Sequence, residues 1–121
     1  MVIVVFEFEI SPDKVDRYFE LAAAMREEIE SQPGFKSIER FESLAHEGRF
    51  VSVSTWEDEN AVNAWRQNIK HQQAQAEGRA SIFSHYRLLV AHVIRDYTAD
   101  TSPHHKKRVT LIKGHSRLGR L

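Results

Sequence analysis

The segment from Phe50 to Arg79 changes from strand periodicity to helix periodicity within a few residues, and this change limits the folds open to the chain. Apolar and β-branched residues from Phe50 to Thr55 predict a strand that ends at Trp56. A polar helix-start signal follows at 57–60, and apolar residues then recur at helical spacing. Large aromatic surface thus meets a few polar side chains where a strand passes into helices, a composition typical of a small-molecule pocket.

The rest of the chain also alternates between strands and helices. Apolar residues alternate from Val2 to Ile10, which predicts a first strand. Ser11-Pro12-Asp13 predicts a helix start with Ser11 as N-cap, and one apolar helical face then continues to about Ser31. The remaining expected elements are strands at 35–43, 49–56 and 82–97, with 80–83 leading into the last, and two helical pieces within 58–79.

This order, β-α-β-β-α-β, predicts an α+β, ferredoxin-like split βαβ fold with an antiparallel sheet. Helices on one face of such a sheet leave the other face uncovered. The outward positions on that face are apolar, at Ile3, Val5, Val51 and Val53. We therefore expect a homodimer in which a second copy covers this face.

Composition excludes several classes of site. The chain has 121 residues, which suits one domain, and it contains no cysteine, so a disulfide framework and a thiolate metal site are excluded. No apolar run reaches the roughly 20 residues that a membrane helix needs. The first residues lack the features of a signal peptide, and we expect a cytoplasmic protein with no metal.

Charge is distributed unevenly along the chain. Residues 1–100 carry 11 Lys and Arg against 17 Asp and Glu, whereas residues 101–121 carry six Lys and Arg and no acid. We expect a domain at 1–97 and a basic tail at 98–121 that packs on the acidic body through Val109, Leu111 and Ile112. Nucleic acid is the less favoured partner, because the tail has no aromatic residues to stack on bases.

Several short motifs occur in an order that resembles the antibiotic biosynthesis monooxygenase (ABM) family over residues 1 to about 97. The motifs are Phe6-Glu7-Phe8, Ser11-Pro12, Pro33-Gly34-Phe35, Ser54-Thr55-Trp56, Ala61 to Ala64-Trp65, and His71. The resemblance implies a dimeric α+β barrel with one pocket per subunit between the sheet and its helices. Members include cofactor-free monooxygenases that oxidise polycyclic phenols to quinones, haem-degrading enzymes and proteins of unknown activity.

Trp56 matches a tryptophan found near the pocket of the quinone-forming and haem-degrading members. The quinone-forming type has an asparagine four residues earlier, where this chain has Ser52. The haem-degrading type has an asparagine in the first strand, where Phe6 is nearest, and an iron-binding histidine where this chain has Gln75. His71 lies one helical turn before that position, so the resemblance favours the monooxygenase type over haem degradation.

Trp56, His71 and Arg79 are the candidate catalytic residues, and each has a structural alternative. Trp56 can be plain core, His71 a surface or hydrogen-bonding residue, and Arg79 an ion-pair partner of the acidic body. Trp65 is expected in the core, in phase with Ala61. The candidate substrate-binding residues are Phe6, Phe8, Ser52, Gln75 and Tyr86.

The leading hypothesis is a cofactor-independent monooxygenase that acts on a small aromatic or phenolic compound. Trp56, Phe6 and Phe8 would surround the ring, His71 would accept the phenolic proton, and Arg79 or Tyr86 would stabilise the oxyanion. The alternative from another class is a non-catalytic, small-ligand-binding or stress-related module on the same fold. Haem degradation is the third hypothesis.

Overall fold

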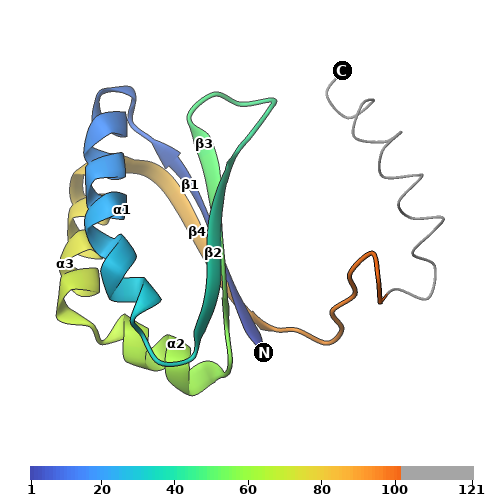
Figure 1. The fold of residues 1–121 in the computed structure, drawn as a ribbon. Coiled ribbons are helices and arrows are strands. Elements are labelled where there is room, and N and C mark those ends of the chain that lie inside the picture. Colours follow the sequence, from blue (N-terminus) through green and yellow to red (C-terminus); the bar gives the residue numbers. More distant parts are fainter. Residues whose placement is uncertain (102–121) are drawn as a thin grey trace.

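A computed structural model describes residues 1–101, which form a four-stranded antiparallel sheet with helices packed on one face (Figure 1). The strand order is β2-β3-β1-β4, so the first strand lies inside the sheet. This arrangement confirms the predicted α+β, ferredoxin-like fold. The predicted packing of the basic tail through Val109, Leu111 and Ile112 lies outside the described residues. In chain order the elements are β1 (Val2–Ile10), a 3-10 turn (Pro12–Lys14), α1 (Val15–Glu30), β2 (Phe35–Glu42), β3 (Arg49–Trp56), α2 (Glu59–Arg66), α3 (Ile69–Glu77), a π-helix (Gly78–Ile82) and β4 (Phe83–His92).

The start of α1 differs from the sequence prediction. Pro12 begins a 3-10 turn, and the α-helix itself begins at Val15. The Ser11 side chain makes no capping hydrogen bond within the described part of the chain, and its backbone carbonyl accepts the Lys14 N–H at 2.8 Å. Ser11 thus occupies the predicted N-cap position before Pro12, but it begins a 3-10 turn, and a backbone hydrogen bond rather than its side chain closes that turn.

The last strand is shorter than predicted at both ends. Residues 80–82 belong to the π-helix, and β4 ends at His92 rather than near residue 97. A strand continues only where a neighbour accepts its hydrogen bonds. β4 pairs with β1, whose first strand residue, Val2, lies opposite His92, and Met1 accepts one further backbone bond from Val93 at 3.0 Å. Beyond that point no partner strand exists among residues 1–101.

The register of β1 separates the two faces of the sheet. Phe6 lies opposite Ser52 on β3 and Leu88 on β4, and all three belong to the face that carries the helices. Val5 lies opposite Val53 and Leu89, which belong to the other face. Figure 1 shows α1, α2 and α3 on one side of the sheet, and within residues 1–101 no helix lies on the other side. The predicted outward parity of Val5 and Val53 is confirmed.

The core between sheet and helices consists of two separate clusters. One lies around Trp56 and Trp65, and the other lies around Phe8 and Ile82. Val4 borders the first cluster and Phe6 the second, so the boundary between the clusters crosses β1 between these two residues. Aromatic side chains dominate both clusters, and they supply much of the buried area of so small a domain.

The turn between α1 and β2 depends on Gly34, which has a φ of 83°. A Cβ at this position would lie 2.6 Å from the Cβ of Ala61 on α2. Gly48 has a similar φ of 82°, but the nearest atom to a Cβ there, the Ile10 carbonyl oxygen, would be 3.8 Å away. Both positions thus favour glycine because of their positive φ. At Gly34 the close approach of α2 also leaves no room for a side chain, whereas Gly48 has that room.

Gly34→Ala is therefore expected to destabilise the domain more than Gly48→Ala. Each alanine should cost about 1–2 kcal/mol for its left-handed backbone. Gly34→Ala should cost about 1–3 kcal/mol more, because α2 must shift to admit the methyl group. Urea unfolding of the two variants measures the difference, and equal losses would contradict the close packing of Gly34 against α2.

Candidate active site

His71 is positioned by the first turn of α3. Asn68 precedes the helix as its N-cap, and its Oδ1 accepts the backbone N–H of His71 at 3.0 Å. Asparagine is a preferred N-cap because its short side chain reaches back to the free N–H groups of the first turn. This bond orients the turn so that His71 lies on the partly buried face of α3, together with Ala74 and Gln75.

The His71 ring stacks on the ring of Trp65, with centroids 4.4 Å apart and an interplanar angle of 26°. Its Nδ1 is inaccessible to solvent, and no residue in the described range forms a hydrogen bond with it. Burial lowers the pKa of His71 below its ordinary value, and the nearby backbone of Trp65 opposes part of this effect. His71 is therefore a neutral imidazole at pH 7 with one unsatisfied ring nitrogen, which is the state that a general base requires.

Trp56 lies in the core, next to Trp65. Its side chain is only 1% exposed, and its Nε1–H donates to the Ser54 hydroxyl at 3.0 Å. The Phe35 ring packs on it edge-to-face at 5.3 Å, and the Trp65 ring lies 6.4 Å away. Trp65 itself is buried, as predicted. Trp56 thus supports Trp65, and Trp65 in turn supports the His71 ring.

Phe6, Phe8 and Tyr86 lie together on the helix-side face of β1 and β4. The Phe6 ring stacks on Phe8 at 5.0 Å, and the Tyr86 ring lies 6.2 Å from it. Phe83 joins the same group at 5.3 Å from Phe6. Phe8 is almost fully buried, whereas Tyr86 is 46% exposed. Beyond Tyr86, on the same face of β4, Leu88 and Val90 are 51% and 49% exposed, so apolar surface remains open along this strand.

Ser52, Gln75 and Arg79 lie at different distances from this region. Ser52 is opposite Phe6 in the sheet, and Gln75 follows His71 by one turn on the same face of α3. Arg79 is exposed in the π-helix, eight residues after His71, which is about 12 Å along a helix axis. Arg79 forms no ion pair with another described residue. The structure thus places Ser52 beside Phe6 and Gln75 on the same helix face as His71, and it leaves Arg79 exposed.

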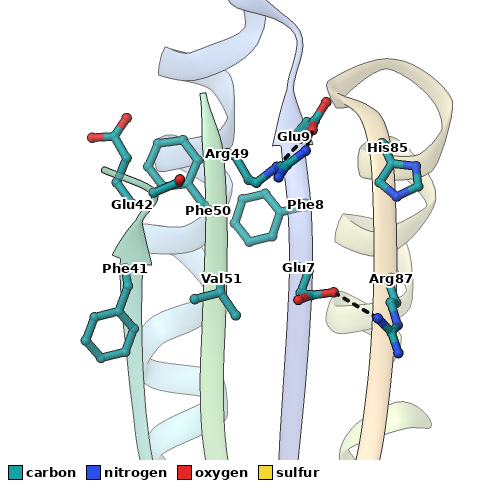
Figure 2. A pocket seen from close by; sticks show the side chains of 11 residues that line it. Glu7, Phe8, Glu9, Phe41, Glu42, Arg49, Phe50, Val51, His85 and Arg87 are labelled. Carbon is teal, nitrogen blue, oxygen red and sulfur yellow. Dashed lines mark hydrogen bonds and ion pairs between the residues drawn. The ribbon is translucent and has the colours of Figure 1, made fainter. Parts of the chain in front are cut away.

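A shallow hollow of about 390 Å³ lies on the opposite, uncovered face of the sheet (Figure 2). Two ion pairs cross it, between Glu9 and Arg49 at 2.7 Å and between Glu7 and Arg87 at 3.7 Å. The hydrogen bond from Arg49 is the main cause that lowers the pKa of Glu9. The lining residues are Glu7, Phe8, Glu9, Phe41, Glu42, Ser43, Arg49, Phe50, Val51, His85 and Arg87.

This hollow is not the candidate active site. Of the predicted site residues, it includes only Phe8, whose side chain belongs to the core on the other face. Four of its charged groups already form two ion pairs, and it lies on the face whose apolar centre holds Val5 and Val53. The unsatisfied imidazole and the open aromatic surface lie on the helix side, which is the better place for chemistry on an aromatic ring.

Sequence reasoning missed the residues that hold His71 in place. Asn68 and Glu28 were not singled out, although an asparagine three residues before a helical histidine is a recognisable cap signal. Glu28 carries no such signal, because it meets Asn68 only through the packing of α1 beside α3. Within residues 1–101, no group of three or more His, Asp or Glu side chains is arranged to hold a metal ion. No helix in that range is both long and apolar enough to cross a membrane.

Comparison with known proteins identifies relatives over most of the chain. The family model for antibiotic biosynthesis monooxygenase matches residues 1–77. Jasmonate monooxygenase ABM of Pyricularia oryzae is 33% identical over 112 residues, which are 93% of this chain and 50% of that protein. This chain therefore spans about half the length of that relative. The uncharacterized protein YqjZ of Bacillus subtilis is 36% identical over 78 residues, covering 64% of this chain and 67% of that protein.

A solved structure shares the fold at low sequence identity. SnoaB of Streptomyces nogalater, described as a cofactor-independent oxygenase, superposes with a TM-score of 0.68 at 15% identity. The superposition covers 78% of this chain and 94% of that one. At this level of identity the likeness supports the fold.

The buried position of His71 is expected to make stability depend on pH. Its pKa is lowered in the folded state, so the unfolded chain binds a proton first as the pH falls. The free energy of unfolding should therefore decrease from about pH 6.5 downward, through the lower pKa of the folded state. Urea unfolding at several pH values should show a smaller decrease for His71→Gln. The exposed His46 supplies the control, and a His46→Gln effect equal to that of His71→Gln would contradict this assignment.

Proposed function

This chain belongs to the antibiotic biosynthesis monooxygenase family, and we propose that it oxidises a small aromatic or phenolic compound with molecular oxygen, without a cofactor. The family and the fold shared with a cofactor-independent oxygenase support the reaction class. The observation that carries the proposal is the His71 ring, stacked on Trp65 with its Nδ1 unsatisfied and its pKa lowered by burial.

His71 would act as the general base. A phenolic hydroxyl group needs a positioned acceptor for its proton, and a neutral imidazole near its titration range is suited to this task. No described residue forms a well-aligned hydrogen bond with the Nδ1 of His71, although the Trp65 backbone lies close to the ring, so a substrate hydroxyl would become its partner. Proton transfer to His71 would leave a phenolate, which donates electrons to oxygen far more readily than the phenol does.

The oxidation balances with oxygen as the only co-reactant. The phenolate gives electrons to O₂, and one oxygen atom forms a carbon–oxygen bond at a ring carbon that carries hydrogen. That C–H bond and the O–O bond break, the ring becomes a quinone, and the second oxygen atom leaves as water. All four electrons that reduce O₂ come from the substrate, which loses its phenolic hydrogen and one ring hydrogen as it is oxidised from a phenol to a quinone. His71 returns its proton during the formation of water.

The aromatic group on β1 and β4 would bind the ring of the substrate. Phe6 and Tyr86 offer ring faces and edges on the helix side, and Leu88 and Val90 extend the apolar surface along β4. Flat rings pack well on such surfaces, which also exclude water from the reacting oxygen. Trp56 and Phe8 are buried behind this surface, where they would support Trp65 and Phe6.

Polar groups on the same side would stabilise the oxyanion. The Tyr86 hydroxyl lies on the strip that would bind the ring, and Gln75 and Ser52 present polar atoms on the facing elements. We favour Tyr86 over Arg79 for this role, because Arg79 lies in the exposed π-helix, away from His71. Removing one oxyanion donor from a preorganised site lowers the rate by about 10²–10³.

A homodimer through the uncovered face of the sheet forms part of the proposal. Apolar side chains occupy the centre of this face, and ion pairs occupy one end of it. An exposed apolar surface of this kind is typical of a protein interface. In a two-fold symmetric dimer, the same face of a second copy would pack against it. Two sheets packed in this way would form the shared core of an α+β barrel.

The second candidate function is a binding module without chemistry. The open apolar strip formed by Tyr86, Leu88 and Val90 favours it, because this strip would bind an apolar ligand whether or not a proton acceptor were present. Oxygen consumption separates the two functions: a binding module would bind polycyclic phenols and consume no oxygen.

We expect His71→Gln to slow the oxidation of a polycyclic phenol by about 10²–10⁴. The base is active when neutral, so the wild-type rate should fall as the pH drops below the lowered pKa of His71, and the variant should lose this acidic limb. An oxygen electrode and quinone absorbance, measured across pH, give both results. His46→Gln is the matched control, and identical profiles for wild type and His71→Gln would exclude the base role.

We expect the wild-type protein to be a dimer at micromolar concentration and Val53→Asp to be a monomer or an aggregate. The variant would place an unpaired charge in an apolar interface, which costs several kcal/mol. Asn63→Asp adds the same charge on the exposed surface of α2 and should remain dimeric. Light scattering after size exclusion decides the matter, and a wild-type monomer would contradict the dimer.

A further inference from the structure

The helix that carries His71 is held to the domain by side chains that are only partly buried. Within the described residues, α3 contains no buried residue, whereas α2 buries Ala61, Val62 and Trp65. The apolar residue at the start of α3, Ile69, is 71% exposed. Burial of apolar area is the main force that fixes a helix on a sheet. α3 therefore needs other contacts to keep its position.

A carboxylate on α1 supplies contacts to the first turn of α3. Glu28 Oε1 accepts a hydrogen bond from Lys70 Nζ at 2.9 Å, and Glu28 Oε2 accepts one from Asn68 Nδ2 at 3.5 Å. Asn68 Oδ1 in turn accepts the His71 backbone N–H at 3.0 Å. A continuous chain of polar contacts thus leads from Glu28 through Asn68 to His71.

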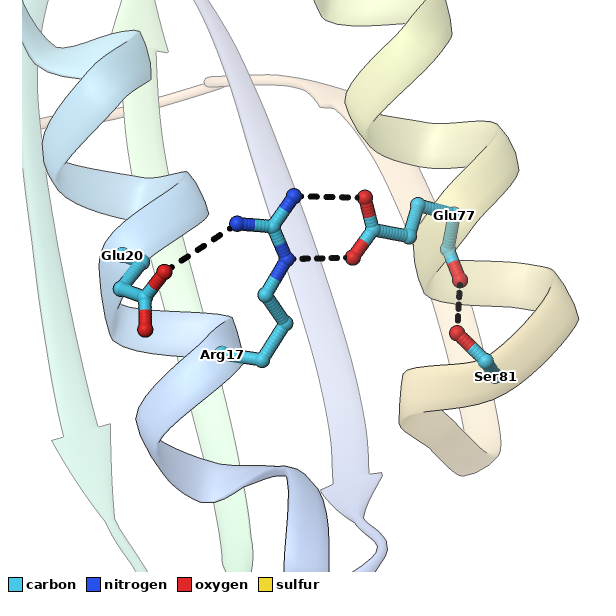
Figure 3. Close-up of polar contacts among 4 residues, drawn as sticks. All are labelled: Arg17, Glu20, Glu77 and Ser81. Carbon is cyan, nitrogen blue, oxygen red and sulfur yellow. Dashed lines mark hydrogen bonds and ion pairs between the residues drawn. The ribbon is translucent and has the colours of Figure 1, made fainter.

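The other end of α3 is attached to α1 by a separate ion pair (Figure 3). Arg17 donates from Nε to Glu77 Oε2 at 2.6 Å and from Nη2 to Glu77 Oε1 at 2.8 Å. This two-bonded geometry is the strongest form of a guanidinium–carboxylate pair, and Arg17 also contacts Glu20 at 3.2 Å. The next residue, Gly78, is buried so tightly that a Cβ there would lie 2.6 Å from the Phe83 ring. The C-terminal end of α3 is thus attached more firmly than its first turn.

A substrate cannot reach the Nδ1 of His71 while α3 holds this position. Its Nδ1 is inaccessible to solvent, and one face of its ring lies against Trp65. Trp65 is buried in the core, so α3 is the element that can move. Exposed ion pairs contribute only about 0–1 kcal/mol and are weakened by salt, so contacts of the kind that Glu28 makes hold a helix reversibly.

We propose that Glu28 is a positioning residue for His71: through Asn68 and Lys70 it holds the first turn of α3 against Trp65, and release of these contacts lets this turn move outward and expose His71 to substrate. The Arg17–Glu77 pair and the packing of Gly78 keep the far end of the helix attached during this movement. The consequence for catalysis rests on the proposed function of His71. The position of α3 can be measured without any substrate.

A single introduced thiol tests the movement. The chain contains no cysteine, so Ala74→Cys places the only thiol on the inner face of α3, one turn after His71. In this background, Glu28→Gln keeps the shape of the side chain and removes its charge. The rate of thiol reaction with a small disulfide reagent should rise about 2- to 5-fold at low salt, as expected for the loss of a contact of this size.

Two further variants separate this effect from a general loss of stability. Glu30→Gln makes the same chemical change on the same helix, but among residues 1–101 Glu30 pairs only with Arg26 within α1, at 3.0 Å, so the thiol rate should not change. Lys70→Gln removes the partner of Glu28 from the α3 side and should raise the rate in the same direction. The melting temperatures of all three variants should stay close together.

The ring of Trp65 provides a second, spectroscopic readout. Stacking at 4.4 Å shifts the His71 ring-proton resonances, and Glu28→Gln should move them toward the values of an exposed histidine, while Glu30→Gln leaves them in place. Equal thiol rates and unchanged His71 resonances in Glu28→Gln and Glu30→Gln would overturn the positioning role. If wild-type protein oxidises no phenol, the proposed function fails, and the thiol and resonance data still decide the role of Glu28.

Discussion

The pairing of β1 with two neighbours organises the whole domain. β1 is hydrogen-bonded to β3 on one side and to β4 on the other, and each of its residues is thereby assigned to one face of the sheet. Val4, Phe6 and Phe8 contribute to the core under the helices. Val5 and Glu7 contribute to the uncovered face. A shift of one residue in this register would exchange the two sets, and the core would lose its aromatic groups to solvent.

The two faces have different tasks because their side chains differ in kind. On the helix side, aromatic rings dominate the two core clusters. On the other side, apolar residues give way toward one end to the Glu7–Arg87 and Glu9–Arg49 pairs. A surface that combines an apolar centre with paired charges at one end suits association with a matching surface. The helix side, with its unsatisfied imidazole, suits chemistry on a small apolar molecule.

The position of His71 shows how a small domain places a reactive group on a weakly held element. Trp56 and Trp65 form a rigid support, because both are buried and both pack on neighbouring rings. The histidine lies against that support from a helix that contributes no buried side chain of its own. Because Trp65 is rigidly packed and α3 is held mainly by polar contacts, α3 can move while Trp65 stays in place.

The order of the elements and the faces of the strands could be predicted from residue patterns alone. Alternation in β1 and β3 gave the correct parity for Val5 and Val53, because the side-chain period of a strand is 2 wherever the strand lies. The bounds of β3 followed from its residue types as well. The spacing of Ala61 and Trp65 placed both in the core for the same reason, since a helix repeats every 3.6 residues.

The ends of some elements, and the residues that lie around His71, depend on how distant parts of the chain pack together. β4 ends at His92 because its partner strand β1 begins at Val2, directly opposite. The residue types at 93–97 carry no information about where β1 begins. Arg79 shares a helical segment with His71 in sequence but lies apart from it, while Glu28, about 40 residues away, is bonded to the residue that caps its helix. Periodicity is a local property of the chain, whereas contacts between α1 and α3 depend on how the helices pack across the sheet, and residues far apart in sequence meet only through that packing.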